Sequence, residues 1–237
     1  MSINSNEIEN FIYQQGASFV GFSNVQQKLP DNLRKYPYAI TFGIRLSDAI
    51  VEEIDTQPTF TYFNHYRSIN SLIDSISLKL ILFLQKHHYN GYSIAASQSI
   101  PTAEIPYSGM FQHKTAAVAA GLGWIGRSAL FIHKEYGPRV RLGTVLTDLP
   151  LCEGSLGDSV DYSLKNICEN CGNCVKACPA LAIRGNKWEM GDSREALLDA
   201  HACSEYMSNN FKNIGRGSVC GICMKVCPCN LLNISCE

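Results

Sequence analysis

Apolar residues recur along the first part of the chain with spacings that predict helices. Between His65 and His88, apolar residues stand at 69, 72, 73, 76, 80, 83 and 84, a helical period kept for about six turns. Glu7–Gln15 has a shorter helical pattern, with Asn6 as its expected cap. His113–Ala120 has a third, which ends at Gly121. These segments predict three helices before residue 151.

Three further segments have the composition or the alternation of strands. Tyr38–Leu46 and Tyr92–Ala96 are short and rich in aromatic or β-branched residues. Arg139–Leu149 places Val140, Leu142 and Leu146 on one face with a period of two. Residues 1–151 therefore predict a domain of the α/β class.

The cysteines divide the chain in two. All 11 lie at or beyond Cys152, and the segment from Cys152 to Ile167 is rich in Gly, Ser and Asp. We therefore predict an α/β domain over residues 1–151 and a small domain over residues 152–237, folded around its cysteine ligands. Ser193–Asn209 is predicted to be a helix that delivers Cys203.

Charge and hydropathy exclude some functions. The 20 Lys and Arg residues nearly balance 21 Asp and Glu residues, for a net charge of −1, which disfavours binding nucleic acid mainly through phosphates. No apolar run exceeds the length of Leu80–Leu84, far below the ~20 residues of a membrane span. The N-terminal residues show no secretory signal. The sequence predicts a cytoplasmic protein without a membrane partner.

The cysteine spacing is typical of bacterial ferredoxins. The runs are Cys168-x2-Cys171-x2-Cys174-x3-Cys178-Pro179 and, after Cys203, Cys220-x2-Cys223-x3-Cys227-Pro228. An odd number of cysteines in a cytoplasmic chain disfavours a disulfide framework. Zinc is the alternative ligand for paired CxxC motifs, but two complete runs favour two [4Fe–4S] clusters.

In such a double run, the first three cysteines of each run ligate one cluster and the fourth ligates the cluster of the other run. This rule assigns the eight predicted ligands to two sets. The first set is predicted to be Cys168, Cys171, Cys174 and Cys227. The second set is predicted to be Cys178, Cys203, Cys220 and Cys223. Three cysteines remain as predicted non-ligands: Cys152, Cys229 and Cys236. Cys229 is expected to lie beside the second cluster and to influence the potential of that cluster.

A glycine-rich segment precedes the cysteines. Three glycines occur in six residues of GLGWIGR, either as a tight turn or as backbone brought against a large flat cofactor. The segment lacks the preceding strand and later acidic residue of a dinucleotide-binding fingerprint, and no P-loop is present. The predicted cofactor contacts are Gly121, Leu122, Gly123, Trp124, Gly126 and Arg127.

The stretch AAVAAGLGWIGRSALFIHKEYGPRVRLGTVLTDLPL, from Ala116 to Leu151, together with the double cysteine run, resembles the cobalamin-dependent iron–sulfur reductases. Epoxyqueuosine reductases and reductive dehalogenases are the known branches of this family. The resemblance implies a nitroreductase-like α/β domain that holds a corrinoid, with Arg139 among the residues around the cofactor. It also implies that an external donor such as ferredoxin or flavodoxin supplies electrons, which two [4Fe–4S] clusters pass to cobalt.

The resemblance further implies a proton donor. Where epoxyqueuosine reductases carry an Asp before the glycine turn, this chain has Tyr107, and reductive dehalogenases use a tyrosine as the acid. Tyr107 is thus either the proton donor or a packed aromatic residue. A phenol has a pKa near ~10, so a cation is needed to make it a better acid. Lys114, Arg139 and Arg141 are the candidates, and His113 is a second potential donor.

Two departures from the family concern the substrate. The chain ends shortly after Cys227, without the helical extension by which epoxyqueuosine reductases engage tRNA, and it lacks their Asp. With the near-neutral charge, this makes tRNA an unlikely partner and predicts a compact branch that reduces a small molecule. Two alternatives stay open: a ferredoxin-like electron carrier or activase without its own substrate, and a reductase that holds flavin in the same domain.

Overall fold

The structure is a computed structural model that describes residues 3–100, 107–151, 163–189, 191–217 and 219–230. The chain forms two compact units that alternate along the sequence. The first unit comprises Met1–Arg45, Ile69–Leu122 and Arg141–Val160, and the second comprises Leu46–Ser68, Gly123–Val140 and Asp161–Glu237. Segments before residue 151 therefore belong to the unit that holds the cysteines. A domain boundary at residues 151 and 152 stays a prediction.

The first unit is built on a four-stranded sheet in the order β1-β2-β6-β3. The strands are β1 (Phe19–Asn24), β2 (Tyr38–Arg45), β3 (Gly91–Ile94) and β6 (Val140–Thr147). β1 is antiparallel to β2, and β3 is antiparallel to β6. Phe19 lies opposite Gly43, whose missing side chain leaves room for the phenylalanine ring.

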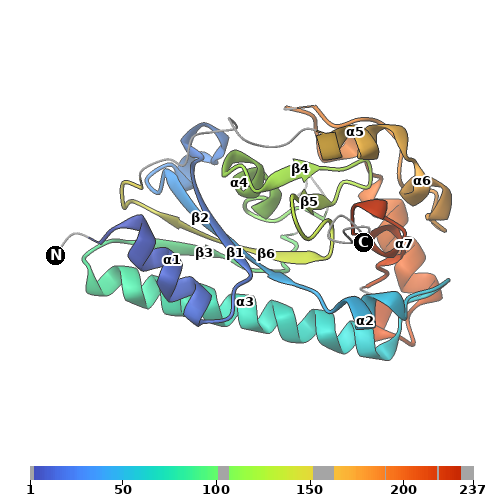
Figure 1. Cartoon of the computed structure of the whole chain (residues 1–237), viewed down its shortest axis with the longest axis horizontal. Coiled ribbons are helices and arrows are strands. Elements are labelled where there is room, and N and C mark those ends of the chain that lie inside the picture. The colour runs from blue at the N-terminus through green and yellow to red at the C-terminus, as the bar shows by residue number, and fades with distance from the viewer. Residues whose placement is uncertain (1–2, 101–106, 152–162, 190, 218, 231–237) are drawn as a thin grey trace, which may run out of the picture. The chain divides into compact units, whose positions relative to one another are not determined.

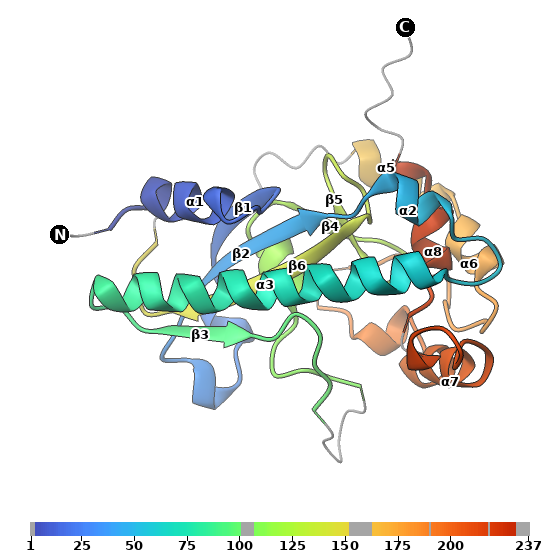
Figure 2. The same cartoon turned by 90° about the horizontal axis from the view of Figure 1, so that it is seen from below.

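Helices cover both faces of this sheet, as Figures 1 and 2 show. α1 (Ser5–Gln14) and α3 (Phe60–Lys86) lie on one face, and α4 (His113–Ala119) lies on the other. A Cβ built on Gly143 would lie 2.7 Å from Ile73 of α3, and one on Gly21 would lie 3.0 Å from Ala120 at the end of α4. Glycine in the strands thus permits close packing of helices on both faces. The α/β class is confirmed.

α3 is long and apolar enough to pass the length and composition test for a membrane-spanning helix. Its buried residues follow a helical stripe, Ile69, Ile73, Ile76, Leu80 and Leu84, which is the pattern of a helix packed against a core. A core helix and a membrane span both satisfy the test, so the test carries little weight. The cytoplasmic location stays a prediction.

The second unit contains short elements. They are α2 (Asp48–Glu52), β4 (Gly123–Ile125), β5 (Phe131–His133), α5 (Ser163–Asn170), α6 (Asn173–Ala177), α7 (Ala200–Asn210) and α8 (Ile222–Lys225). β4 and β5 form an antiparallel hairpin, and α6 packs against α8. Short 3-10 helices complete the two units: Gln26–Lys28, Asp31–Leu33, Arg194–Ala196, Gly215–Gly217 and Pro228–Asn230. Cysteine side chains form much of the local core around Ala182 and Ile183.

The two CxxC loops repeat one backbone conformation. Gly172, between Cys171 and Cys174, has φ +90°, and Gly221, between Cys220 and Cys223, has φ +84°. Each glycine is the N-cap of a short helix, α6 or α8. Glycine reaches this left-handed region without steric cost, so both loops can turn sharply between their cysteines.

Most predicted elements before residue 151 are confirmed within a few residues, and the starts of two predicted helices, one in each part of the chain, are corrected. α1 is capped by Asn4 and not by Asn6: Asn4 Oδ1 accepts the Glu7 N–H at 3.0 Å, and Glu7 Oε2 accepts the Asn4 N–H at 2.9 Å. α7 begins at Ala200 and not at Ser193, because Asp199 caps it by accepting the Ala202 N–H at 2.9 Å. The strands β1, β4 and β5 were not predicted.

Candidate metal centre

The thiols of the first set gather in the second unit. Cys168 belongs to α5, Cys174 to α6, and Cys227 follows α8. The thiol of Cys174 lies within electrostatic range of Cys168, Cys171 and Cys227. Burial raises the pKa of Cys174 to about 11. Residues from two distant parts of the sequence thus bring four thiols around one space.

The second set gathers in the same way. Cys203 belongs to α7 and Cys223 to α8, and Cys223 interacts electrostatically with Cys178, Cys203 and Cys220. Burial raises the pKa of Cys203 to about 11 and raises that of Cys223 as well. Cys178 lies next to Cys174 in the first run but interacts with thiols of the second, which is the crossing that the ferredoxin spacing predicts.

The donor chemistry of both sets suits an iron–sulfur cluster. All eight side chains are soft sulfur ligands. Within the described ranges, no three His, Cys, Asp or Glu side chains come close enough to hold a single metal ion. Two sets of four thiols match the number of ligands that two [4Fe–4S] clusters require. Burial raises the pKa of five of these thiols, and a hydrogen bond with Cys229 together with burial raises that of Cys227. These raised pKa values keep six thiols protonated at neutral pH, so binding a cluster must release protons: Cys168, Cys174, Cys203, Cys220, Cys223 and Cys227.

A fifth thiol lies beside the first set. Cys229 is 1% exposed and shares a hydrogen bond with Cys227, which lowers the pKa of Cys229 and raises that of Cys227. It also interacts with Cys168, Cys171 and Cys174. Its role as a non-ligand stays a prediction, and Cys152 and Cys236 lie outside the described residues.

The β4–β5 hairpin approaches Cys168. A Cβ built on Gly126 would lie 3.3 Å from Cys168 Sγ, so a larger residue there would press on the sulfur. The backbone N–H of Arg127 and the indole N–H of Trp124 both favour the thiolate form of Cys168. Three residues predicted to contact a cofactor therefore surround a cysteine of the first set.

The side chain of Arg127 joins helix α5 to the loop at Gly185. Its Nε donates to the Gly185 carbonyl at 2.7 Å, its Nη2 donates to the same oxygen, and its Nη1 donates to the Glu169 carbonyl at 3.4 Å. Charged donors strengthen bonds to carbonyl oxygens. Arg127 thus ties α5, which carries Cys168, to the loop at Gly185.

Gly121, Leu122 and Gly123 contact protein atoms. Gly121 has φ +68°, which favours glycine in the turn after α4. Leu122 is buried in the first unit and packs near Gly21. A Cβ on Gly123 would collide with the Ile132 carbonyl of β5. The assignment of these residues to a cofactor stays a prediction.

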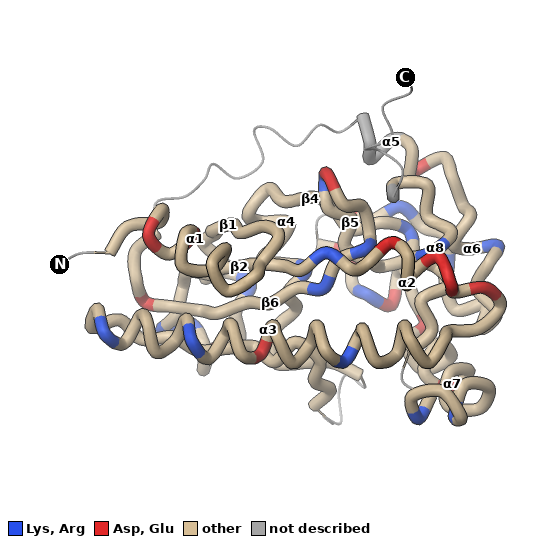
Figure 3. The backbone as a smooth tube through the Cα atoms, turned by 60° about the horizontal axis from the view of Figure 1, so that its bottom comes forward, with Lys and Arg blue, Asp and Glu red and all other residues tan. Residues whose placement is uncertain are grey.

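Arg139 is the centre of a charge network in the second unit. Its side chain is 5% exposed, donates to Asp48 Oδ1 at 2.8 Å and pairs with Glu52, which also pairs with Lys225. The bonds from Lys225 and Arg139 lower the pKa of Glu52. Figure 3 shows the acidic positions along α2. The charge of Arg139 also acts on Cys227, so the network adjoins the first set.

The predicted catalytic residues Tyr107, Lys114 and Arg141 lie in the first unit. Tyr107 is 41% exposed, with φ +59°, and Lys114 is half-buried on α4. Arg141 donates to Asn70 Oδ1 at 3.0 Å and to the Ala96 carbonyl at 3.2 Å. Its catalytic role, like those of Tyr107 and Lys114, stays a prediction.

His113 joins elements of the first unit. Its Nε2 lies 3.0 Å from the Ala95 carbonyl, which can only accept, so Nε2 carries the proton. Nδ1 then accepts from Thr144 Oγ1 at 2.9 Å. Burial lowers the pKa of His113 to about 4. A neutral imidazole with both nitrogens bonded ties α4 to β6 and to the end of β3.

We expect His113 to make the fold sensitive to acid. The unfolded pKa is near 6.5 and the folded pKa is about 4, so its contribution is present above pH 6.5 and is lost between pH 6.5 and pH 4. The loss should reach about 3 kcal/mol at most. Unfolding of the wild type and His113→Gln at pH 7 and pH 4.5 measures it, with exposed His88→Gln as control. A His113 ring that titrates near pH 6.5 in the folded protein by NMR would contradict the expectation.

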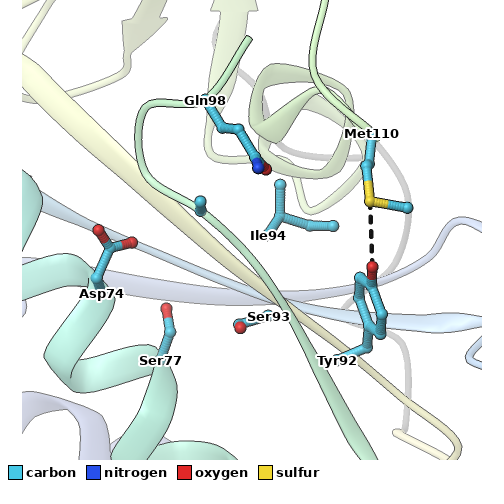
Figure 4. Close-up of a pocket in the computed structure, with 8 residues that line it drawn as sticks. Asp74, Ser77, Tyr92, Ser93, Ile94, Gln98 and Met110 are labelled. Atoms are coloured by element: carbon cyan, nitrogen blue, oxygen red, sulfur yellow. Dashed lines mark hydrogen bonds between the residues drawn. The ribbon is translucent and has the colours of Figure 1, made fainter. Parts of the chain in front are cut away.

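The first unit also contains a cavity of about 360 Å³, lined by α3, β3 and the residues that follow β3 (Figure 4). Its lining residues are Asp74, Ser77, Tyr92, Ser93, Ile94, Ala95, Gln98 and Met110. Tyr92 donates its hydroxyl to Met110 Sδ at 3.1 Å, and Asp74 accepts the Ala96 N–H at 2.9 Å. The cavity has the size and the polar groups to take a small polar molecule.

Comparisons with known proteins agree with these sites. Residues 167–230 match the family described as a 4Fe-4S double cluster binding domain. A tetrachloroethene reductive dehalogenase of Sulfurospirillum multivorans is 33% identical over 132 residues, 54% of this chain and 25% of that protein. An epoxyqueuosine reductase of Gloeobacter violaceus is 33% identical over 135 residues, 52% of this chain and 37% of that protein. The chain thus spans only about a quarter to two fifths of the length of these relatives.

Solved structures share the fold. A catabolic reductive dehalogenase matches 94% of this chain and 31% of its own, with a TM-score of 0.73 and 23% identity. An epoxyqueuosine reductase solved with a tRNA-Tyr epoxyqueuosine-modified stem loop matches 95% of this chain and 64% of its own, with a TM-score of 0.58 and 16% identity. The comparisons therefore agree on a mixed α/β fold with a 4Fe-4S double cluster binding domain, and the relatives that share it are named as reductases. The chain is similar in sequence to reductive dehalogenases and epoxyqueuosine reductases and shares their fold, which confirms the resemblance.

The prediction that tRNA is an unlikely partner is wrong. Epoxyqueuosine reductases are relatives of this chain, and one structure with its fold contains a tRNA stem loop. The prediction depended on the near-neutral net charge, on the missing Asp and on the missing helical extension. The net charge is a poor guide, because a local arrangement of cations suffices to bind phosphates.

Proposed function

We propose that this protein passes electrons through two [4Fe–4S] clusters to a bound corrinoid, which reduces a small substrate. The observation that carries the proposal is the gathering of eight thiols into two sets of four. The first set would hold one cluster and the second set the other. Two clusters held in one small unit provide a path for single electrons.

The crossed cysteines support electron transfer between the clusters. Cys178 belongs to the first run but interacts with Cys203 and Cys220, while Cys227 of the second run interacts with Cys168. Each run would therefore contribute to both clusters. The chain segments that carry the ligands keep the two sites at a fixed separation.

The corrinoid part of the proposal is supported by relatives. One structural neighbour, with a TM-score of 0.72 and 23% identity, is a reductive dehalogenase whose structure suggests a mechanism for B12-dependent dehalogenation. A corrinoid would supply a strongly reducing cobalt centre. The cavity of about 360 Å³ in the first unit suits a small molecule and is too small for a corrinoid macrocycle, so we assign no step through the corrinoid to particular residues.

We propose the first unit, with a nitroreductase-like fold, as the substrate and cofactor region. Tyr107 would donate a proton, and Lys114 or Arg141 would make its phenol a better acid. The names of relatives point to two substrate classes, an organohalide and an epoxide on a modified nucleoside. Both contain an electrophilic carbon whose bond to halogen or oxygen breaks on two-electron reduction. The organohalide takes up two electrons and one proton and releases halide, whereas an epoxide reduced to an alkene takes up two electrons and two protons and releases water.

Anaerobic purification with analysis of iron, sulfide, corrinoid and flavin tests the proposal. We expect about eight irons per chain and one equivalent of added hydroxocobalamin bound, with a changed absorption spectrum. Loaded protein with dithionite should then reduce tetrachloroethene or an epoxyqueuosine stem loop. Two clusters without corrinoid binding or turnover would favour an electron carrier, and bound flavin would favour a flavin reductase. Zinc, or far less than eight irons, would contradict the proposal.

A further inference from the structure

Buried polar atoms without a partner point to an absent group. Four side-chain atoms among the described residues are buried without a hydrogen bond: Thr41 Oγ1, Ser77 Oγ, Trp124 Nε1 and Arg139 Nε. Leaving such an atom unpaired destabilises the folded state, so native structures usually supply a partner. Trp124 and Arg139 both belong to the second unit, and each lies beside a cysteine of the first set.

Trp124 directs its donor toward Cys168. The residue is 2% exposed and stands in β4, paired with Ile132 of β5, so the backbone fixes its position. Its indole N–H acts on the Cys168 thiolate, as the Arg127 backbone N–H does. Gly126, without a side chain, lets this hairpin approach the sulfur. A sulfur-rich cluster bound at Cys168 would supply the acceptor that Trp124 lacks.

Arg139 brings a fixed positive charge within electrostatic range of Cys227, another cysteine of the first set. Asp48 and Glu52 hold its terminal nitrogens, so the guanidinium cannot turn toward solvent. Its Nε remains without a partner, and its charge acts on Cys227. The first set therefore has an oriented donor at one ligand and a buried cation at another.

The second set has a different environment. Cys203 lies near the carboxylate of Asp199, which caps α7 and also interacts with Arg184. The backbone N–H of Ile222 acts on Cys220, much as the Asn173 N–H lies 3.4 Å from Cys171 Sγ. Loop donors are thus repeated in both sets, whereas Trp124 and Arg139 act on the first.

We propose that Trp124 and Arg139 raise the reduction potential of the cluster held by the first set above that of the second set. The inference rests on the proposed function, since it requires both clusters. Each cluster takes up one electron in its 2+/1+ couple, and the added negative charge is stabilised by nearby N–H donors and cations. At equilibrium, an electron given to the second cluster by an external reductant therefore passes to the first.

An anaerobic redox titration with dithionite, followed by EPR of the whole loaded protein, tests the inference. Cys171→Ser and Cys220→Ser assign the two signals. Trp124→Phe keeps an aromatic ring but removes the N–H, and should lower the reduction equilibrium constant of the first cluster about tenfold, or about 59 mV for one electron. The second cluster should not shift. Trp188→Phe, at the other tryptophan of the chain, is the matched control.

Arg139→Lys provides a second measurement, since it keeps the charge and removes the Nε donor. It should lower the reduction potential of the first cluster and leave that of the second unchanged. This measurement tests the inference even if Trp124→Phe loses iron. A wild type whose first cluster has the lower potential would overturn the inference. So would variants that shift neither cluster, both equally, or only the second. Iron analysis separates these outcomes from failure of the proposed function, which would appear as a wild type without two clusters.

Discussion

Cys178→Ser is expected to remove the cluster of the second set and to leave that of the first, reducing the iron content from about eight to about four per chain. Cys178 belongs by sequence to the first run, so a simple reading of the motif would expect the opposite. In the structure its sulfur interacts with those of Cys203, Cys220 and Cys223. A serine oxygen is a harder and poorer ligand for iron–sulfur chemistry.

Iron and sulfide analysis with EPR of the anaerobically reconstituted protein measures this result. Cys174→Ser, in the same run as Cys178 and just before it, is the matched comparison and should remove the other signal. Cys229→Ser tests the fifth thiol and should retain about eight irons. Loss of the same signal from Cys178→Ser and Cys174→Ser would mean that each run holds its own cluster, against the crossed arrangement.

The double substitution Asp48→Asn with Glu52→Gln is expected to destabilise the loaded protein by about 3 kcal/mol. Arg139 would keep its charge in a buried position after losing both carboxylates, and an uncompensated buried charge costs about 3–5 kcal/mol. We take the lower value because the two carboxylates are 45% and 52% exposed, which lets water screen the pairs.

Thermal unfolding followed by circular dichroism under anaerobic conditions measures the loss, which should lower Tm by about 6–12 °C for a chain of this size. Glu53→Gln removes a neighbouring exposed carboxylate that accepts from Thr59, and should change Tm by less than about 2 °C. Because the pKa of Glu52 is lowered, its stabilising effect is present above pH 4.5 and is lost at lower pH. A double variant as stable as the wild type would show that Arg139 does not depend on these acids.

Cysteine spacing predicted the two thiol sets because cluster geometry constrains neighbouring ligands within a few residues of sequence. The sequence also predicted helix α3, because the apolar residues that face the core repeat with a helical period over many turns. The sequence could not predict that Arg139 pairs with Asp48 and Glu52. These ion pairs join segments about 90 residues apart, and each segment by itself has the charge pattern of an ordinary protein surface.

The glycine turn shows a different limit. Its composition indicated close approach of the backbone to something large, and the structure shows close approach to β5 at Gly123 and to Cys168 at Gly126. Composition alone cannot tell whether the glycine backbone approaches a cofactor, a neighbouring strand or a cysteine sulfur. The short strands β4 and β5 were not predicted, because three residues are too few to show the alternation of apolar and polar residues that marks a strand.

Because the two units alternate along the sequence, the cysteine-rich region cannot be moved to another protein as one continuous segment. A fragment cut at residue 152 would lack the hairpin with Trp124 and Arg127, as well as Arg139 and α2. Its Cys168 sulfur would lose the cover that these segments provide, and water and oxygen would reach it more readily. Grafting residues 152–237 onto another protein would therefore yield short-lived clusters, whereas a graft that also carries residues 46–68 and 123–140 would keep their protective shell.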